Sequence, residues 1–206
     1  MQALIVVDVQ HDFLPGGALP VPEGDQIVPI VNALMPHFAH VVATQDWHPA
    51  DHGSFAANHP DQTPGNLIDL HGLSQVLWPV HCVQHSKGAE FADELNQSLI
   101  QAVFPKGTDS DIDSYSGFFD NGHRKSTGLS HHLKEMGVDS VVIVGLAADY
   151  CVKYTALDAQ KEGFRTQLVT DATRGVNLQP GDTQRAFEEM QAAGVRLVSS
   201  KAFLGA

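Results

Sequence analysis

Residues 141–152 read Val141-Val-Ile-Val-Gly-Leu-Ala-Ala-Asp-Tyr-Cys-Val152, a β-branched apolar run that passes through a glycine into a segment of helical spacing. The run is typical of a strand buried on both faces. Apolar side chains recur with helical spacing over residues 150–163, which predicts a helix there. Cys151 therefore lies where a strand ends and a helix begins. Free N–H groups at a helix N-terminus favour a thiolate and can hold an oxyanion, so the place suits a nucleophile, although it also suits a small core residue.

The same alternation of strands and helices continues along the chain. Apolar runs predict strands at residues 2–9, 40–44, 102–106, 140–144, 164–171 and 195–199. Helical spacing predicts helices at residues 26–38, 88–100, 127–136, 150–163 and 182–193, the last with Asp182 as its N-cap. Residues 49–79 show little periodicity, and a loop of that length is expected to be functional or to carry small elements of its own. The order indicates an α/β fold, with a parallel sheet covered by helices on both faces, and residues 1–206 are expected to form one domain.

Composition excludes several classes of protein. The chain has 206 residues, of which 43% are hydrophobic and 17% charged, as in globular proteins. Its formal net charge is -12 and no basic residues cluster, so neither nucleic acid nor an anionic membrane is an expected partner. No apolar run approaches the length of a membrane span, and the N-terminus lacks a signal-peptide pattern. Two cysteines make no disulfide scaffold, so we expect a soluble cytoplasmic protein in which Cys82 is structural.

Three predicted strands end in, or lead directly to, reactive side chains. These are Asp8, Lys106 and Cys151. Ligands of parallel α/β folds bind beyond the carboxyl ends of the strands, where these side chains would meet. The carboxylate can take the thiol proton as general base, and the ammonium can hold both negative charges. An ordinary salt bridge beside a core cysteine fits the same pattern.

A second constellation suits a divalent metal ion. Asp46 and His48 stand two residues apart after a predicted strand, and His81 arrives from a distant loop. One carboxylate and two imidazoles make a metal site with open positions. His52 and His59 are further candidates, and any one of these histidines is equally at home as a solvated or hydrogen-bonded loop residue.

Three aromatic residues lie in loops at the same end of the predicted sheet. They are Phe13, Trp78 and Tyr115. Each alone is adequately explained by packing, whereas together they can enclose a flat ring.

Six motifs in chain order resemble the nicotinamidases (pyrazinamidases) of the isochorismatase-like cysteine hydrolases. They are Val6-Val-Asp-Val-Gln-His-Asp-Phe13, Gln45-Asp-Trp-His-Pro49, Trp78-Pro-Val-His-Cys82, Phe104-Pro-Lys-Gly107, Asp113-Ser-Tyr-Ser-Gly-Phe118 and Gly145-Leu-Ala-Ala-Asp-Tyr-Cys-Val152. Each motif alone is weak, but six in order span almost the whole chain. The resemblance implies a three-layer α/β/α fold with a six-stranded parallel sheet.

The resemblance also implies roles for individual residues. These are a catalytic triad of Asp8, Lys106 and Cys151, an oxyanion hole from the amides of Ala147 and Cys151, metal ligands Asp46, His48 and His81, and a ring pocket of Phe13, Trp78, Tyr115 and Tyr150. It implies a cis peptide between Leu146 and Ala147. His52 remains either a further metal ligand or a neighbour of the ligands.

The implied activity is hydrolysis of nicotinamide to nicotinate and ammonia through a cysteine thioester, feeding NAD salvage, with pyrazinamide as a second substrate. One divalent metal ion (zinc, iron or manganese) is the implied cofactor, and a homo-oligomer is left open. The alternative is a related amidohydrolase acting on a carbamoyl or ureido substrate. The metal set argues for a substrate with a ring nitrogen, and Cys151 argues against the vinyl-ether hydrolysis of isochorismatase itself. A non-catalytic sensor would not need all three triad residues.

Overall fold

The centre of the protein is a six-stranded parallel sheet in the order β5-β2-β1-β6-β7-β8. The computed structural model describes residues 1–205. The strands are β1 (Gln2–Val7), β2 (His40–Asp46), β5 (Ala102–Lys106), β6 (Ser140–Leu146), β7 (Arg165–Arg174) and β8 (Arg196–Val198). All seven residues of β6 are buried, as expected for a central parallel strand covered on both faces. The predicted six-stranded α/β fold is therefore confirmed.

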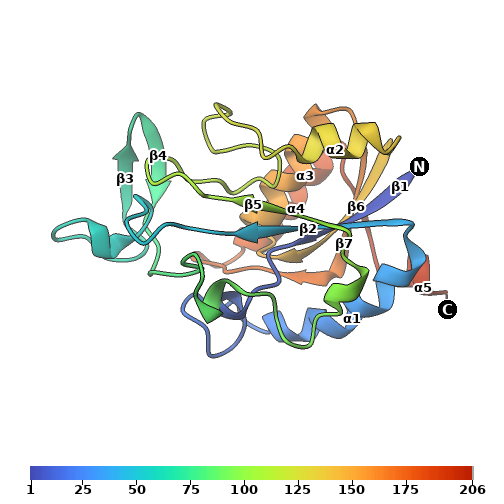
Figure 1. Ribbon diagram of the computed structural model, residues 1–206, viewed down its shortest axis with the longest axis horizontal. Helices are drawn as coiled ribbons and strands as arrows, with labels where there is room; N and C mark the ends of the chain where they lie inside the picture. Colours follow the sequence, from blue (N-terminus) through green and yellow to red (C-terminus); the bar gives the residue numbers. More distant parts are fainter. Residues whose placement is uncertain (206) are drawn as a thin grey trace.

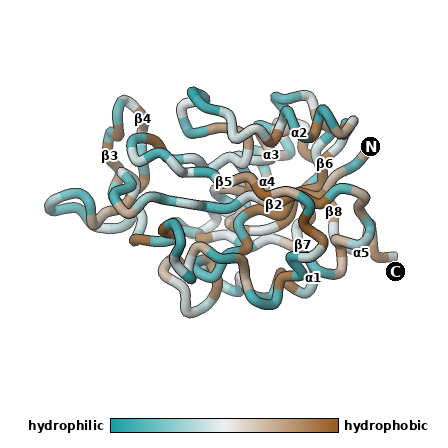
Figure 2. Tube along the Cα trace, in the orientation of Figure 1, coloured by the Kyte–Doolittle hydropathy of each residue, from teal (hydrophilic) through white to brown (hydrophobic). Residues whose placement is uncertain are grey.

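Helices cover both faces of this sheet (Figure 1). On one face α1 (Val28–Leu34) and α5 (Lys201–Leu204) pack with Leu4, Val6 and their neighbours. On the other face lie α2 (Leu129–Glu135), α3 (Cys151–Lys161) and α4 (Asp182–Ala192). The hydrophobic colour in Figure 2 is concentrated in the strands between these layers, while the outer loops are mixed and carry most of the hydrophilic colour. The apolar core is thus split by the sheet into two clusters.

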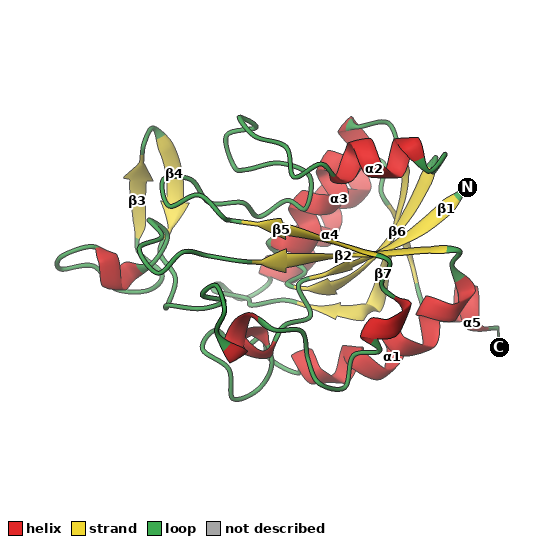
Figure 3. Ribbon diagram, in the orientation of Figure 1, coloured by secondary structure: helices red, strands yellow, loops and turns green. Residues whose placement is uncertain are grey.

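A separate hairpin stands beyond the carboxyl ends of the strands. Its strands β3 (Leu67–Leu70) and β4 (Leu73–Val76) pair antiparallel and do not join the main sheet. In Figure 1 the arrows of β2 and β5 point toward this hairpin, and both chain termini lie at the opposite end. Figure 3 shows that loops fill most of the space between hairpin and sheet. The unperiodic stretch 49–79 therefore does carry small elements, and they overhang the edge where ligands bind in such folds.

One predicted helix is wrong. Residues 88–100 form only two short 3-10 turns, Lys87–Ala89 and Gln97–Leu99, joined by irregular chain. Their backbone instead bonds to the loop after β1: His11 N donates to Glu90 O (3.0 Å) and Ala92 N to Val9 O (2.9 Å). These tertiary hydrogen bonds, together with burial of Phe91, override the helical propensity of the sequence.

Other predicted boundaries shift. The helix expected at residues 26–38 is α1 flanked by 3-10 turns, and the one expected at 127–136 is the shorter α2. Helix α4 is capped by Gly181, with Asp182 as its first residue instead of its cap. Helix α5 was not predicted because its four residues carry no periodic signal. Within residues 1–205, no helix combines the length and apolar character that crossing a membrane requires.

Candidate functional site

The chain adds strands on one side of β1 up to β5 and on its other side from β6 onward. The candidate site lies in the crevice between β1 and β6, where this strand order reverses. Asp8 follows β1 directly, in a left-handed backbone conformation (φ 48°) that Asp tolerates better than most residues. Gly145 lets β6 approach β1 closely, because a Cβ there would collide with the backbone of Val7. Cys151 begins α3, so the predicted strand-to-helix junction is confirmed.

Lys106 is the centre of a buried polar cluster. Its Nζ lies 3.3 Å from Cys151 Sγ and 2.9 Å from Asp8 Oδ2, and it forms a further short contact with Asp46 Oδ1. All four residues are 7% exposed or less. Thr44 donates to Asp8 Oδ1 (2.6 Å), whereas the polar partner of Oδ2 within residues 1–205 is the Lys106 ammonium of the ion pair. Asp8 Oδ2 thus keeps a lone pair open beside the thiol.

The pKa values of this cluster follow from burial and charge. Burial raises the pKa of Asp8 to about 6, although Lys106 and the Thr44 hydroxyl oppose the rise. Burial likewise raises the pKa of the Cys151 thiol well above its usual value, and Lys106 only partly offsets this. Burial would lower the pKa of Lys106, but the carboxylates of Asp46 and Asp8 outweigh it, and the net pKa lies well above its usual value. The resting cluster therefore holds a neutral thiol, a charged lysine and a carboxyl that titrates within the ordinary working range.

Two backbone amides at the strand-to-helix junction are free. Among residues 1–205, the amides of Ala147 and Cys151 donate no hydrogen bond, whereas their neighbour Ala148 donates to Arg174 O (2.8 Å). The Leu146–Ala147 peptide is cis, as the resemblance implied. Both free N–H groups belong to residues that line the same crevice as the thiol. Free amides at the start of a helix are suited to an oxyanion.

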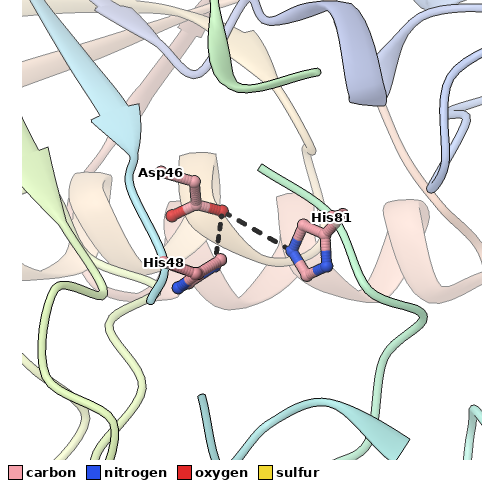
Figure 4. A group of neighbouring side chains, drawn as sticks. All are labelled: Asp46, His48 and His81. Atoms are coloured by element: carbon pink, nitrogen blue, oxygen red, sulfur yellow. Dashed lines mark ion pairs between the residues drawn. The ribbon is translucent and has the colours of Figure 1, made fainter. Parts of the chain in front are cut away.

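The predicted metal ligands come together at the end of β2. Figure 4 shows Asp46, His48 and His81 facing one another, with both histidines directed at the same carboxylate oxygen. Asp46 Oδ2 lies 3.5 Å from His48 Nε2 and 3.9 Å from His81 Nε2. Ligands held about 2.1 Å from one tetrahedral metal ion are themselves about 3.4 Å apart, so the spacing fits a shared ion. The other oxygen of Asp46 contacts Lys106, so one carboxylate joins the metal-ligand group to the catalytic cluster.

Backbone carbonyls fix the tautomers of these two histidines. His48 Nδ1 contacts Gly107 O at 2.8 Å, and His81 Nδ1 contacts Pro79 O at 2.7 Å. A carbonyl can only accept, so each Nδ1 carries a proton, and in the neutral ring each Nε2 presents a lone pair. Burial would lower the pKa of His48, but the Asp46 carboxylate outweighs it and the net pKa is raised, so a metal ion would displace a proton from that ring. Burial, aided by the neighbouring His48, lowers the pKa of His81 to about 4, so that ring is neutral at neutral pH. The donor set therefore fits a divalent cation of the zinc or iron type.

Aromatic residues line the mouth of the crevice. The rings of Trp78 and Tyr150 meet edge to face with centroids 4.8 Å apart, and Tyr115 and Tyr150 do so at 5.4 Å. Phe13 packs against the His81 ring at 5.5 Å. The crevice thus has an aromatic wall beside the metal-ligand group and the thiol.

Comparison with known proteins assigns the family. Residues 2–202 match the isochorismatase domain. The chain belongs to the isochorismatase family. It is 50% identical over 202 residues to a nicotinamidase of Escherichia coli (strain K12), covering 95% of this chain and 93% of that protein.

Among solved structures, an Acinetobacter baumanii nicotinamidase pyrazinamidase superposes with a TM-score of 0.95 at 48% identity, covering 98% of this chain and 97% of that one. A Pyrococcus horikoshii pyrazinamidase in complex with zinc superposes with a TM-score of 0.78 at 43% identity, covering 96% of this chain and 98% of that one. Within the isochorismatase family, the protein therefore falls in the nicotinamidase/pyrazinamidase group.

His52 differs from the candidate metal ligands His48 and His81 in its hydrogen bonding. It is fully buried, and its ring lies 4.3 Å from that of His48. Ser54 N donates to His52 Nδ1 (3.2 Å), which places the proton of the neutral ring on Nε2. A protonated Nε2 has no lone pair for a metal. That nitrogen is nevertheless buried without a hydrogen-bond partner among residues 1–205, and His52 lies within ligand distance of His48 and Asp113, so His52 stays open as either a further metal ligand or a neighbour of the ligands. His59 lies apart and contacts Gly53 O (2.7 Å).

Four residues that contact or line the site were not predicted from the sequence. They are Thr44, Gln75, Gly107 and Asp113. Gly107 and Asp113 stand at the ends of recognised motifs, so their position was a usable signal. Thr44 and Gln75 act through side-chain contacts with distant segments, which no local pattern reveals.

Proposed function

We propose that this protein is a cysteine amidohydrolase that converts nicotinamide to nicotinate and ammonia. The observation that carries the proposal is the convergence on one crevice of a buried thiol, an open carboxylate oxygen, two free amides and a three-residue metal-ligand group. The high identity to nicotinamidases over nearly the whole chain supports the choice of substrate.

Asp46, His48 and His81 would hold the metal ion through Oδ2, Nε2 and Nε2. When bound, a divalent ion there supplies a Lewis acid able to coordinate a ring nitrogen or a water. The zinc in the Pyrococcus horikoshii relative supports a divalent ion, and we propose zinc, iron or manganese for this chain.

The chain's own residues can carry the covalent steps. Asp8 Oδ2 takes the proton of Cys151 Sγ as the sulfur attacks the carboxamide carbon, and the amides of Ala147 and Cys151 stabilise the oxyanion. Protonated Asp8 returns that proton to the nitrogen, the C–N bond breaks, and ammonia leaves a thioester. Asp8 then takes a proton from water, which attacks the thioester carbon. The Sγ–C bond breaks to release the acid, and Asp8 returns its proton to Sγ to restore the thiol.

Lys106 supports these steps without exchanging a proton. Its ammonium lies between the carboxylate and the sulfur, so it stabilises negative charge on either atom as the proton passes between them. Its raised pKa keeps it charged throughout.

The aromatic residues suit a flat heteroaromatic ring. Phe13, Trp78, Tyr115 and Tyr150 would line the ring pocket, and a pyrazine ring has the same size as a pyridine ring, so we propose pyrazinamide as a second substrate.

The first test is ammonia release from nicotinamide by purified, metal-loaded protein, with and without a thiol alkylating agent. We expect release that alkylation abolishes. Cys151→Ala should show no turnover but retain the metal, because its side chain is outside the ligand group. Turnover by that variant would refute the nucleophile.

A second comparison tests the metal ligands. His48→Ala should lose metal measured by elemental analysis, whereas His131→Ala should keep it, since the His131 side chain is 78% exposed and remote. Equal metal content in the two variants would overturn the ligand assignment.

A further inference from the structure

The hairpin above the site sends one polar side chain inward. Gln75 lies on β4 and is 2% exposed, while its neighbour Ser74 is exposed. The inward positions of a short strand usually carry apolar residues. A buried amide in such a place has to be hydrogen-bonded to be tolerated.

The amide of Gln75 reaches two residues of the site. Nε2 lies 2.9 Å from Asp113 Oδ2, 3.0 Å from the Tyr115 hydroxyl and 2.7 Å from Val76 O. The carboxylate and the carbonyl can only accept, so the NH₂ group and not the amide oxygen must face them. Three acceptors share two hydrogens, and the orientation of the amide is thereby fixed.

The Tyr115 hydroxyl in turn connects Gln75 to the aromatic wall. It accepts a hydrogen bond from Trp78 Nε1 (3.2 Å) as well as from Gln75. Both lone pairs of the phenol oxygen are then used, and neither ring can tilt without breaking a bond. Tyr115 and Trp78 also each pack edge to face on Tyr150, so a shift of Tyr115 would disturb the contacts of all three rings.

Within residues 1–205, the polar contacts of hairpin residues 67–76 with later segments are those of Gln75, a hydrogen bond from Arg124 to His71 O (3.4 Å) and an ion pair between His71 and Asp111 (3.6 Å). A two-stranded hairpin is marginally stable by itself, so its position depends on such contacts. From these contacts we infer that Gln75 is a positioning residue that sets the width of the ring pocket, and hence which ring substituents the enzyme accepts. The predicted effect on substrate preference rests on the proposed function, whereas the predicted effect on the position of the Trp78 and Tyr115 rings does not.

The test compares two substitutions with a matched control. Gln75→Leu replaces the amide with an apolar side chain of broadly similar size and removes both donors, whereas Gln75→Glu also places a carboxylate against Asp113. Ser74→Glu adds the same charge on the outer side of the same strand. Ser74 lines a surface groove with Tyr115 and Tyr150, but among residues 1–205 its side chain makes no hydrogen bond to Gln75, Trp78 or Tyr115.

Kinetics with nicotinamide and 5-methylnicotinamide give the first readout. We expect KM for nicotinamide to rise roughly tenfold in Gln75→Leu and more in Gln75→Glu, with kcat within about threefold of wild type. We expect the preference for nicotinamide over its methylated analogue, measured as the ratio of kcat/KM values, to fall in both variants and to stay unchanged in Ser74→Glu. A merely structural role would reduce the active fraction, lowering kcat for both substrates and leaving KM and the ratio alone; that result would overturn the inference.

A second readout does not depend on activity. The indole N–H resonance of Trp78 in a ¹H–¹⁵N spectrum, assigned by its loss in Trp78→Phe, should shift in both Gln75 variants and not in Ser74→Glu. An unmoved resonance would overturn the positioning role. Wild-type protein that releases no ammonia would refute the proposed function, and the indole resonance would still decide the role of Gln75.

Discussion

The buried carboxyl of Asp8 predicts where activity falls on the acid side. Burial raises its pKa to about 6, and the proposed mechanism needs the ionised form to accept the thiol proton. Below that pH the ionised fraction falls about tenfold for each pH unit, so kcat/KM should show an acid limb with a midpoint near pH 6.

Thr44 offers a way to move that limb. Its hydroxyl donates to Asp8 Oδ1 at 2.6 Å and is one of the groups that lower the pKa of Asp8. Thr44→Val keeps the shape of the fully buried side chain and removes the donor. A hydrogen bond to a charged group contributes about 1.5–3 kcal/mol, so its loss should move the limb about 1–2 pH units upward.

The assay is kcat/KM for ammonia release between pH 4.5 and 8.5, with metal content measured at every pH so that metal loss is not mistaken for titration. Thr166→Val is the matched control, because Thr166 is also buried but its hydroxyl bonds to Phe164 O (3.1 Å), away from the site. An acid limb near pH 4 in the wild type, or one that stays in place in Thr44→Val, would refute the assignment of Asp8 as the titrating base.

Other perturbations test the site separately. Since the pKa of Asp8 is raised in the folded state, its contribution to stability is greatest below pH 4 and is lost as the pH rises through 6. The free energy of unfolding of metal-free wild type, measured relative to Asp8→Asn in denaturant titrations, should therefore fall by about 3 kcal/mol over that range. A difference that does not change with pH would contradict this prediction. Gly107→Ala should lower metal affinity about 10- to 100-fold in chelator competition, because the added Cβ would collide with the His48 ring that Gly107 O orients, and unchanged affinity would argue against that orienting role. Asp149→Asn should lower the melting temperature by several degrees. The Asp149 carboxylate accepts hydrogen bonds from the backbone amides of residues 176 and 177, and the asparagine side chain would replace one of these acceptors with a donor. An unchanged melting temperature would show that these two hydrogen bonds are dispensable.

The residues at strand ends were predictable because their positions follow from one rule. In a parallel sheet all carboxyl ends lie at one edge, so Asp8, Asp46 and Lys106 had to converge once the strands before them were recognised. Cys151 followed from the same rule, since it opens the helix after β6. Short β-branched runs are strong signals, and these strands were the best predicted elements.

What sequence could not predict is what depends on contacts between distant segments. The stretch 88–100 has helical spacing, yet its backbone bonds to the loop after β1 instead. In the sequence, Gln75 is one polar residue in a stretch without periodicity. Its role depends on contacts with Asp113 and Tyr115, which lie some forty positions later in the chain. Propensity is a local property, whereas these choices are made by tertiary hydrogen bonds.

The charge balance of the cluster explains how a buried thiol with a raised pKa can serve as a nucleophile. With a neutral thiol, the carboxylates of Asp8 and Asp46 face the single ammonium of Lys106. Losing the proton of Cys151 to solvent would add a negative charge to a buried site, which is why its pKa is raised. Passing the proton to Asp8 leaves the total charge unchanged and only moves it from one side of Lys106 to the other. The thiolate is therefore expected to form only as part of the attack. Lys106 contacts both Asp8 and Cys151, so it lowers the free-energy cost of the proton transfer between them.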